Sequence, residues 1–173
     1  MDHAVTPFTD SSGRDDPRLE FCFEIALKFA RHESVGMMPS GAGRGFVYLD
    51  SGTITGPRLT GRVLPFSGGD WALFRPDDVL ATDARYMLEA SDGTRILMHN
   101  RGYLWGRQPD TIRRMQRWMF EGGPGVPFED FYLRAAPTFE VQAGPHDWLM
   151  RHIFVGIGQR QADGNLIRYY ALL

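Results

Sequence analysis

The sequence predicts a mainly all-β fold: a closed, antiparallel, up-and-down type β-barrel of about 8 to 10 strands with one amphipathic helix. Two observations lead to this prediction. Short apolar or alternating runs recur along the chain between turns rich in glycine, proline and aspartate, as in an antiparallel meander. A single segment, Pro109 to Glu121, instead spaces its apolar residues as a helix does.

The first predicted strand, Leu19 to Ala30, sets the pattern for the others. Its odd-numbered residues from Phe21 to Phe29 are apolar, which is typical of a strand with one buried face. Ser91-Asp92-Gly93 is a strong hairpin signal between two later strands. The other predicted strands are Phe46 to Asp50, Leu59 to Pro65, Trp71 to Phe74, Leu80 to Ala90, Thr94 to Trp105, Tyr132 to Val141, Ile153 to Gln159 and Leu166 to Leu173.

Pro109 suits the first turn of the predicted helix, and Gly122-Gly123-Pro124 ends it. We expect this helix to cover one end of the barrel. A shorter helical turn is expected over Pro145 to Met150.

A chain of 173 residues has room for one core. Residues 1–18 are polar and aperiodic and predict a flexible N-terminal extension, so residues 19–173 form a single barrel domain. A net charge of −2 gives no reason to expect nucleic acid as a partner. The start of the chain lacks the pattern of a signal peptide, and no apolar run could cross a membrane, so a cytoplasmic location is expected. Edge strands and the extension favour a homodimer.

The chain shows no motif for a cofactor, and we expect none. The single cysteine, Cys22, lies in an apolar run and is interpreted as a packed thiol. The five histidines have no recognised metal spacing, so no metal site is predicted. The glycine-rich segment 41–45 has no following lysine and no strand–helix context, which excludes a phosphate loop. It is expected to be a mobile loop at the barrel mouth, with Arg44 reaching inward.

Polar residues on the inward register of a small barrel mark a pocket, so we expect the site inside the barrel. Asp70 is the candidate general base and Trp71 a wall against the ligand, although Asp70 could instead cap a turn while Trp71 packs in the core. Tyr132 and His99 are candidate acids. For both residues, a purely structural hydrogen-bonding role is the competing interpretation.

A small-molecule ligand would need further contacts. Arg44, Arg101 and Arg134 are candidate anion clamps, Asn100 is a candidate hydrogen-bond donor, and Trp148 is a second wall. Arg85 shares a strand face with Asp83 and either contacts the ligand or forms a structural ion pair with that aspartate. Gly102 indicates a close backbone approach or a bulge.

Several sequence blocks, in their order along the chain, resemble those of a known family. The blocks are Gly52-Thr53-Ile54-Thr55-Gly56-Pro57-Arg58-Leu59-Thr60-Gly61-Arg62-Val63-Leu64-Pro65, Gly68-Gly69-Asp70-Trp71, Asp83-Ala84-Arg85-Tyr86, Asn100-Arg101-Gly102, residues 132–140, Trp148-Leu149 and residues 154–158. They are similar to domain of unknown function family 3237 (uncharacterised protein family 0311). The resemblance covers residues 19–173 and implies a closed barrel of the lipocalin and streptavidin type without a cofactor. Relatives often have an asparagine after the Trp-Leu pair, where this chain has Met150-Arg151.

The predicted function is that of a cofactor-independent enzyme, an isomerase, a lyase or dehydratase, or a cyclase. It would use acid–base chemistry in the barrel pocket on an oxygenated, aromatic or carboxylate-bearing metabolite. The alternative is a lipocalin-like protein that binds a small molecule without turnover. A third interpretation, an interaction domain that docks a partner through the helix, depends on Arg113, Arg114 and Arg117.

Overall fold

The computed structural model describes residues 16–173. Most of the predicted extension, residues 1–18, therefore lies outside the described residues. Residues 16–18 are exposed, and the backbones of Arg18 and Leu173 exchange two hydrogen bonds. The division into an extension and a single domain stays a prediction.

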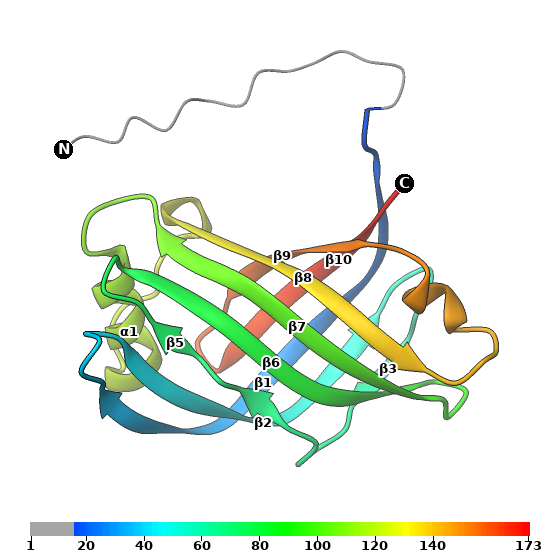
Figure 1. The fold of residues 1–173 in the computed structure, drawn as a ribbon, viewed down its shortest axis with the longest axis horizontal. Coiled ribbons are helices and arrows are strands. Elements are labelled where there is room, and N and C mark those ends of the chain that lie inside the picture. Colours follow the sequence, from blue (N-terminus) through cyan, green and yellow to red (C-terminus); the bar gives the residue numbers. More distant parts are fainter. Residues whose placement is uncertain (1–15) are drawn as a thin grey trace.

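Ten strands pair antiparallel in chain order, and β1 pairs with β10 on one side and with β2 on the other. This closed series of strand pairs confirms the predicted up-and-down barrel (Figure 1). Three short strands, β3, β4 and β5, share the space between β2 and β6. The strands are β1 (Leu19–Met37), β2 (Gly43–Thr55), β3 (Gly61–Val63), β4 (Gly69–Asp70), β5 (Leu73–Phe74), β6 (Val79–Ala90), β7 (Arg95–Gly106), β8 (Phe131–Val141), β9 (Phe154–Arg160) and β10 (Gly164–Leu172).

The barrel interior is filled by alternate residues of these strands. In β6, Ala84, Tyr86 and Leu88 are buried, whereas the residues between them are partly or fully exposed. The same alternation in the other strands supplies large apolar side chains such as Phe23 and Met98, both 0% exposed. Burial of these side chains is the main source of stability, at roughly 25 cal/mol per Å² of apolar surface.

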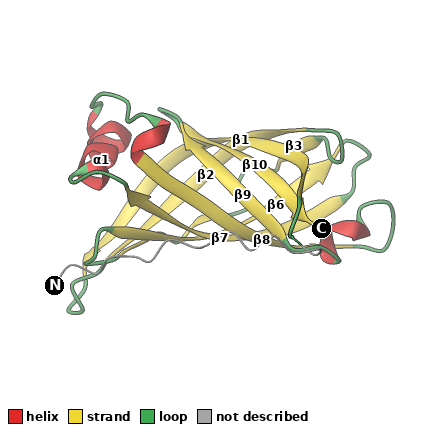
Figure 2. Ribbon diagram, turned by 90° about the horizontal axis from the view of Figure 1, so that it is seen from above, coloured by secondary structure: helices red, strands yellow, loops and turns green. Residues whose placement is uncertain are grey.

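The predicted helix is α1 (Thr111–Glu121), and it lies against one end of the barrel (Figure 2). Its residue Met115 is 1% exposed and belongs to a second apolar cluster with residues of β6, β7 and β8. Gly122 ends the helix in the left-handed conformation, with φ of 69°. The expected short turn is the 3₁₀-helix Asp147–Met150, and another 3₁₀-helix covers Phe128–Asp130. Among the described residues, no helix is long and apolar enough to span a membrane.

Two segments differ from the expected ones. Strand β1 continues to Met37 because it pairs with β2 along its second half. The glycine-rich segment is therefore not a mobile mouth loop: Gly43, Arg44 and Gly45 begin β2 and pair with β1. Arg44 does not reach inward. Its Nη1 donates a hydrogen bond of 2.9 Å to the Trp71 carbonyl oxygen in the outer groove described below.

Candidate functional site

A groove of about 620 Å³ lies on the outer face of the barrel. Its polar residues alternate along β6, β7 and β8 with buried residues such as Ala84 and Asn100, so their side chains leave the sheet on the outer side. The groove is lined by Arg44, Trp71, Leu73, Ala81, Thr82, Asp83, His99, Arg101, Gly102, Tyr103, Tyr132, Arg134, Ala135, Ala136, Thr138 and Val155.

An acid–base pair lies in this groove. His99 Nε2 is 2.5 Å from Asp83 Oδ1, and the His99 side chain is 25% exposed. A carboxylate oxygen accepts hydrogen bonds, so this contact assigns the proton of the neutral imidazole to Nε2. The Nδ1 atom of His99 then carries a lone pair, and no acceptor or donor within residues 16–173 engages it. The pair has the arrangement of a carboxylate-oriented general base.

The groove also gathers cations and aromatic rings. Arg134 lies 4.9 Å from the centroid of the Tyr132 ring, which in turn stacks on Trp105 with centroids 5.1 Å apart. Trp71, which is 52% exposed, also lines the groove. Arg101 is exposed, and its guanidinium has no ion pair or hydrogen bond to any described residue. Together these groups can hold a flat ligand that carries a carboxylate.

The floor of the groove is made of small residues, and Gly102 shows why. A Cβ atom at Gly102 would lie 2.2 Å from the Arg134 carbonyl oxygen and 2.9 Å from Ala135 Cα. Strands β7 and β8 therefore approach each other too closely for a side chain at this position. Of the two features that the sequence indicates at Gly102, the structure has the close backbone approach.

The interior of the barrel holds a second, smaller polar cluster, which contains Asp70 and Asn100. Asn100 Nδ2 donates to the Tyr169 hydroxyl at 3.1 Å, and both residues are buried with Tyr86. The cavity beside them has a volume of about 30 Å³. This exceeds the roughly 10–15 Å³ needed for one water molecule, but it does not hold a metabolite.

Asp70 faces this interior. Its Oδ1 accepts a hydrogen bond of 2.8 Å from the Asp83 amide. Burial raises the pKa of the Asp70 carboxyl to about 6, although the hydrogen bond from the Asp83 amide opposes this rise. The Asp83 carboxylate raises the pKa of Asp70 further.

The structure therefore does not bring all the predicted site residues together. Asp70 and Asn100 lie inside the barrel, on the opposite face of the sheet from Tyr132 and His99. Within residues 16–173, the arginine clamps do not converge inside the barrel as expected, because alternation places them on the outer face. The outer groove unites Arg44, Trp71, His99, Arg101, Tyr132 and Arg134.

Two residues that were predicted to contact the ligand line neither the outer groove nor the interior cavity. Trp148 lies in the 3₁₀-helix Asp147–Met150 and packs against Phe154, and the Arg58 guanidinium is 4.9 Å from its ring centroid. Arg85 is exposed, and the expected ion pair between Arg85 and Asp83 is not formed. Residues two apart on one strand are about 7 Å apart along it, whereas the diagonal neighbour across the ladder, His99, reaches Asp83 directly.

Asp83 is the functional candidate that reasoning from the sequence missed. The signal that reveals it is the hairpin register: the turn at residues 91–93 pairs Asp83 with Arg101 and Arg85 with His99. Counting back from that turn places His99 diagonal to Asp83 on one face. Within residues 16–173, no three histidine, cysteine, aspartate or glutamate residues gather as metal ligands would.

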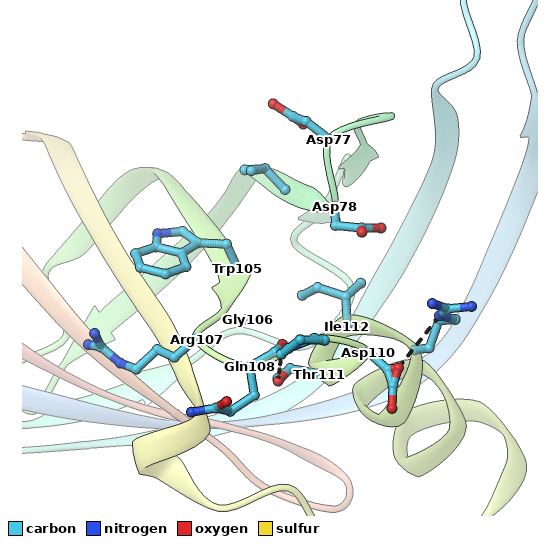
Figure 3. Close-up of a pocket in the computed structure, with 12 residues that line it drawn as sticks. Asp77, Asp78, Trp105, Gly106, Arg107, Gln108, Asp110, Thr111 and Ile112 are labelled. Atoms are coloured by element: carbon cyan, nitrogen blue, oxygen red, sulfur yellow. Dashed lines mark hydrogen bonds and ion pairs between the residues drawn. The ribbon is translucent and has the colours of Figure 1, made fainter. Parts of the chain in front are cut away.

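A second outer hollow, of about 330 Å³, lies at the start of α1 (Figure 3). Trp105 lines this hollow, and Tyr132, on which the Trp105 ring stacks, lines the groove. The stacked pair therefore lies between the hollow and the groove. Asp110 of this hollow lies 3.8 Å from the Arg113 guanidinium, and Asp77 is paired with Arg75 outside it. The lining of this hollow contains no histidine or tyrosine.

These features define a small antiparallel barrel protein with a cationic, aromatic groove on its outer wall. The chain belongs to the family described as "Protein of unknown function (DUF3237)", whose family model matches residues 17–172. This confirms the family that the sequence blocks resemble. A UPF0311 protein of Rhodopseudomonas palustris is 30% identical over 159 residues, which cover 91% of this chain and 99% of the relative.

Solved structures agree with this fold. A structure from Acinetobacter baumannii, described as a beta-barrel like protein, is similar with a TM-score of 0.78 and 24% identity, covering 94% of this chain and 100% of that one. A structure from Penicillium herquei, described as an enzyme, has a TM-score of 0.67 and 20% identity, covering 94% and 99%. At these identities the likeness is one of fold.

Proposed function

We propose that the outer groove is the active site of a cofactor-independent enzyme that moves protons on a small aromatic carboxylate or a related oxygenated metabolite. The single observation that supports this proposal best is the Asp83–His99 pair, 2.5 Å apart, in one groove with Arg101, Arg134 and Tyr132. A homodimer, a small-molecule ligand and a cytoplasmic location stay predictions.

In this mechanism His99 Nδ1 removes a proton from the carbon next to a carbonyl group of the substrate. Asp83 keeps the ring in the required tautomer and stabilises the imidazolium that forms. The electron pair of the broken C–H bond moves to the carbonyl oxygen, where Arg101 or Arg134 stabilises the enolate. Return of the proton to another carbon gives isomerisation. Loss of a β-hydroxyl as water, with a proton from Tyr132, gives dehydration.

The test follows the exchange of an α-proton, because exchange reports the first step without knowledge of the natural substrate. Phenylpyruvate suits the groove, since it has an aromatic ring, a carboxylate and an acidic C–H next to a carbonyl. In D₂O, ¹H NMR is expected to show loss of its α-proton signal faster with the wild-type protein than with buffer.

His99→Asn should slow this exchange by about 10²-fold or more, the usual contribution of a general base. Arg134→Gln should weaken phenylpyruvate binding, measured by quenching of tryptophan fluorescence. His152→Asn is the matched control, because this exposed histidine lies near the 3₁₀-helix before β9 and outside the groove lining. Equal exchange by wild type and His99→Asn would remove His99 as the base. Binding without any exchange would favour the alternative, a lipocalin-like binding protein.

A further inference from the structure

A buried arginine lies at the α1 end of the barrel, on the opposite face of the sheet from the groove. Arg160 is the last residue of β9 and is 8% exposed. Its Nη1 donates a hydrogen bond of 3.2 Å to Asn165 Oδ1, and its guanidinium lies 4.8 Å from the centroid of the Phe29 ring. No carboxylate of residues 16–173 lies within ion-pair distance of this guanidinium.

The guanidinium has unused hydrogen-bonding capacity. Its Nε is buried and donates to no acceptor within the described residues. Burial lowers the pKa of Arg160 to about 10, and the charge of Asp163 opposes this shift, so the group remains a cation at neutral pH. A buried cation without a partner is costly, and such groups are normally paired with an anion.

A hollow of about 130 Å³ lies next to Arg160. Its volume is several times the roughly 10–15 Å³ that one water molecule requires. Three apolar side chains line it, Phe29 of β1, Val47 of β2 and Met119 of α1. The remaining lining residues are Ala30, Arg31, His32, Ala162 and Asp163.

The charge around the hollow favours an anion of single charge. Arg160 and Arg31 are both cations, and Asp163 is the one carboxylate in the lining. The Arg31 guanidinium already has two partners. Its centre lies 4.4 Å from the centroid of the Tyr48 ring, and its Nη1 lies 3.8 Å from Glu33 Oε1. A carboxylate in the hollow would accept charge-assisted hydrogen bonds from the terminal nitrogens of the Arg160 guanidinium.

We propose that this hollow is a binding site for a short-chain monocarboxylate, with the carboxylate on Arg160 and the alkyl chain against Phe29, Val47 and Met119. Such a ligand neutralises the buried charge and fills the apolar part of the hollow. The site is separate from the outer groove, because Arg160 lies on the inward register of β9. The proposal does not depend on the function of the groove.

Butanoate is the probe, with hexanoate to test the contribution of the chain. Sodium butanoate is expected to raise the Tm of the wild-type protein above its value in sodium chloride of equal ionic strength. It should also shift the ¹⁵N NMR signal of the Arg160 Nε–H group. Arg160→Met should weaken butanoate binding by about tenfold or more, because the substitution removes the charge-assisted hydrogen bonds to the carboxylate.

Arg160→Met is expected to fold, since an apolar residue of similar length often replaces a buried ion without loss of stability. Its Tm without butanoate verifies this. Arg168→Met is the matched control: Arg168 also lies 4.8 Å from a phenylalanine ring centroid, that of Phe21, but it is exposed on the outer face of β10. The control should keep the full response. An equal response of wild type and Arg160→Met overturns the proposal, and loss of the response in Arg134→Gln alone moves the anion to the outer groove.

Discussion

Gly102→Ala is expected to destabilise the protein by about 3 kcal/mol, a large effect for the addition of one methyl group. The added Cβ would lie 2.2 Å from the Arg134 carbonyl oxygen, and the obstacle is backbone that cannot rotate away. Strand β8 must therefore move away from β7 where Ala135 pairs with Gly102. Urea denaturation at pH 7 measures the change in the free energy of unfolding.

Gly125→Ala is the control for this substitution. The nearest atoms to a Cβ at Gly125 are in the Trp118 ring at 3.6 Å, an ordinary contact distance. This variant should be neutral or slightly more stable, because alanine restricts the unfolded chain more than glycine does. If the two alanine variants have equal stability, the close approach of β7 and β8 is not a real constraint. Since Gly102 lines the groove, its variant should also bind phenylpyruvate less tightly.

The fold was predictable because hydrophobic alternation and turn residues act locally. The β6–β7 hairpin shows this: the strands expected at Leu80 to Ala90 and Thr94 to Trp105 are observed at Val79–Ala90 and Arg95–Gly106. The helix expected at Pro109 to Glu121 is observed at Thr111–Glu121.

The site was less predictable because alternation assigns each residue to a face but does not say which face is the interior. His99, Arg101 and Arg134 share one register, and the sequence makes them as suitable for a polar lumen as for an outer groove. The burial of the residues that alternate with them identifies the inner face of the sheet: Met98 and Asn100 are 0% and 5% exposed. Arg160 is a second case, since it ends a strand beside a turn, where arginine is usually exposed, but it is buried. Only the closure of the barrel determines these assignments.

Asp70→Asn is expected to stabilise the folded protein at pH 7 to 8, by about 2–3 kcal/mol, and to have little effect near pH 4. The reason is the pKa of the buried carboxyl, raised from 3.8 to about 6 by burial. Well below pH 3.8 the carboxyl is protonated in both the folded and the unfolded state. As the pH rises through about 6, the folded state must hold a buried carboxylate that the unfolded state hydrates freely. The wild-type protein therefore loses stability over this interval, and the asparagine variant does not.

The measurement is the free energy of unfolding of both proteins at several pH values between 4 and 8, taken as a difference so that other titrating groups cancel. Asparagine keeps an oxygen that can accept the hydrogen bond from the Asp83 amide, so the difference reports the charge of residue 70. A difference that does not change between pH 4 and pH 8 would mean that Asp70 is well hydrated. The same variant separates the two positions considered for the base. If His99 is the base, Asp70→Asn continues to exchange the α-proton of phenylpyruvate, whereas loss of exchange in a stabilised protein would assign the chemistry to the barrel interior.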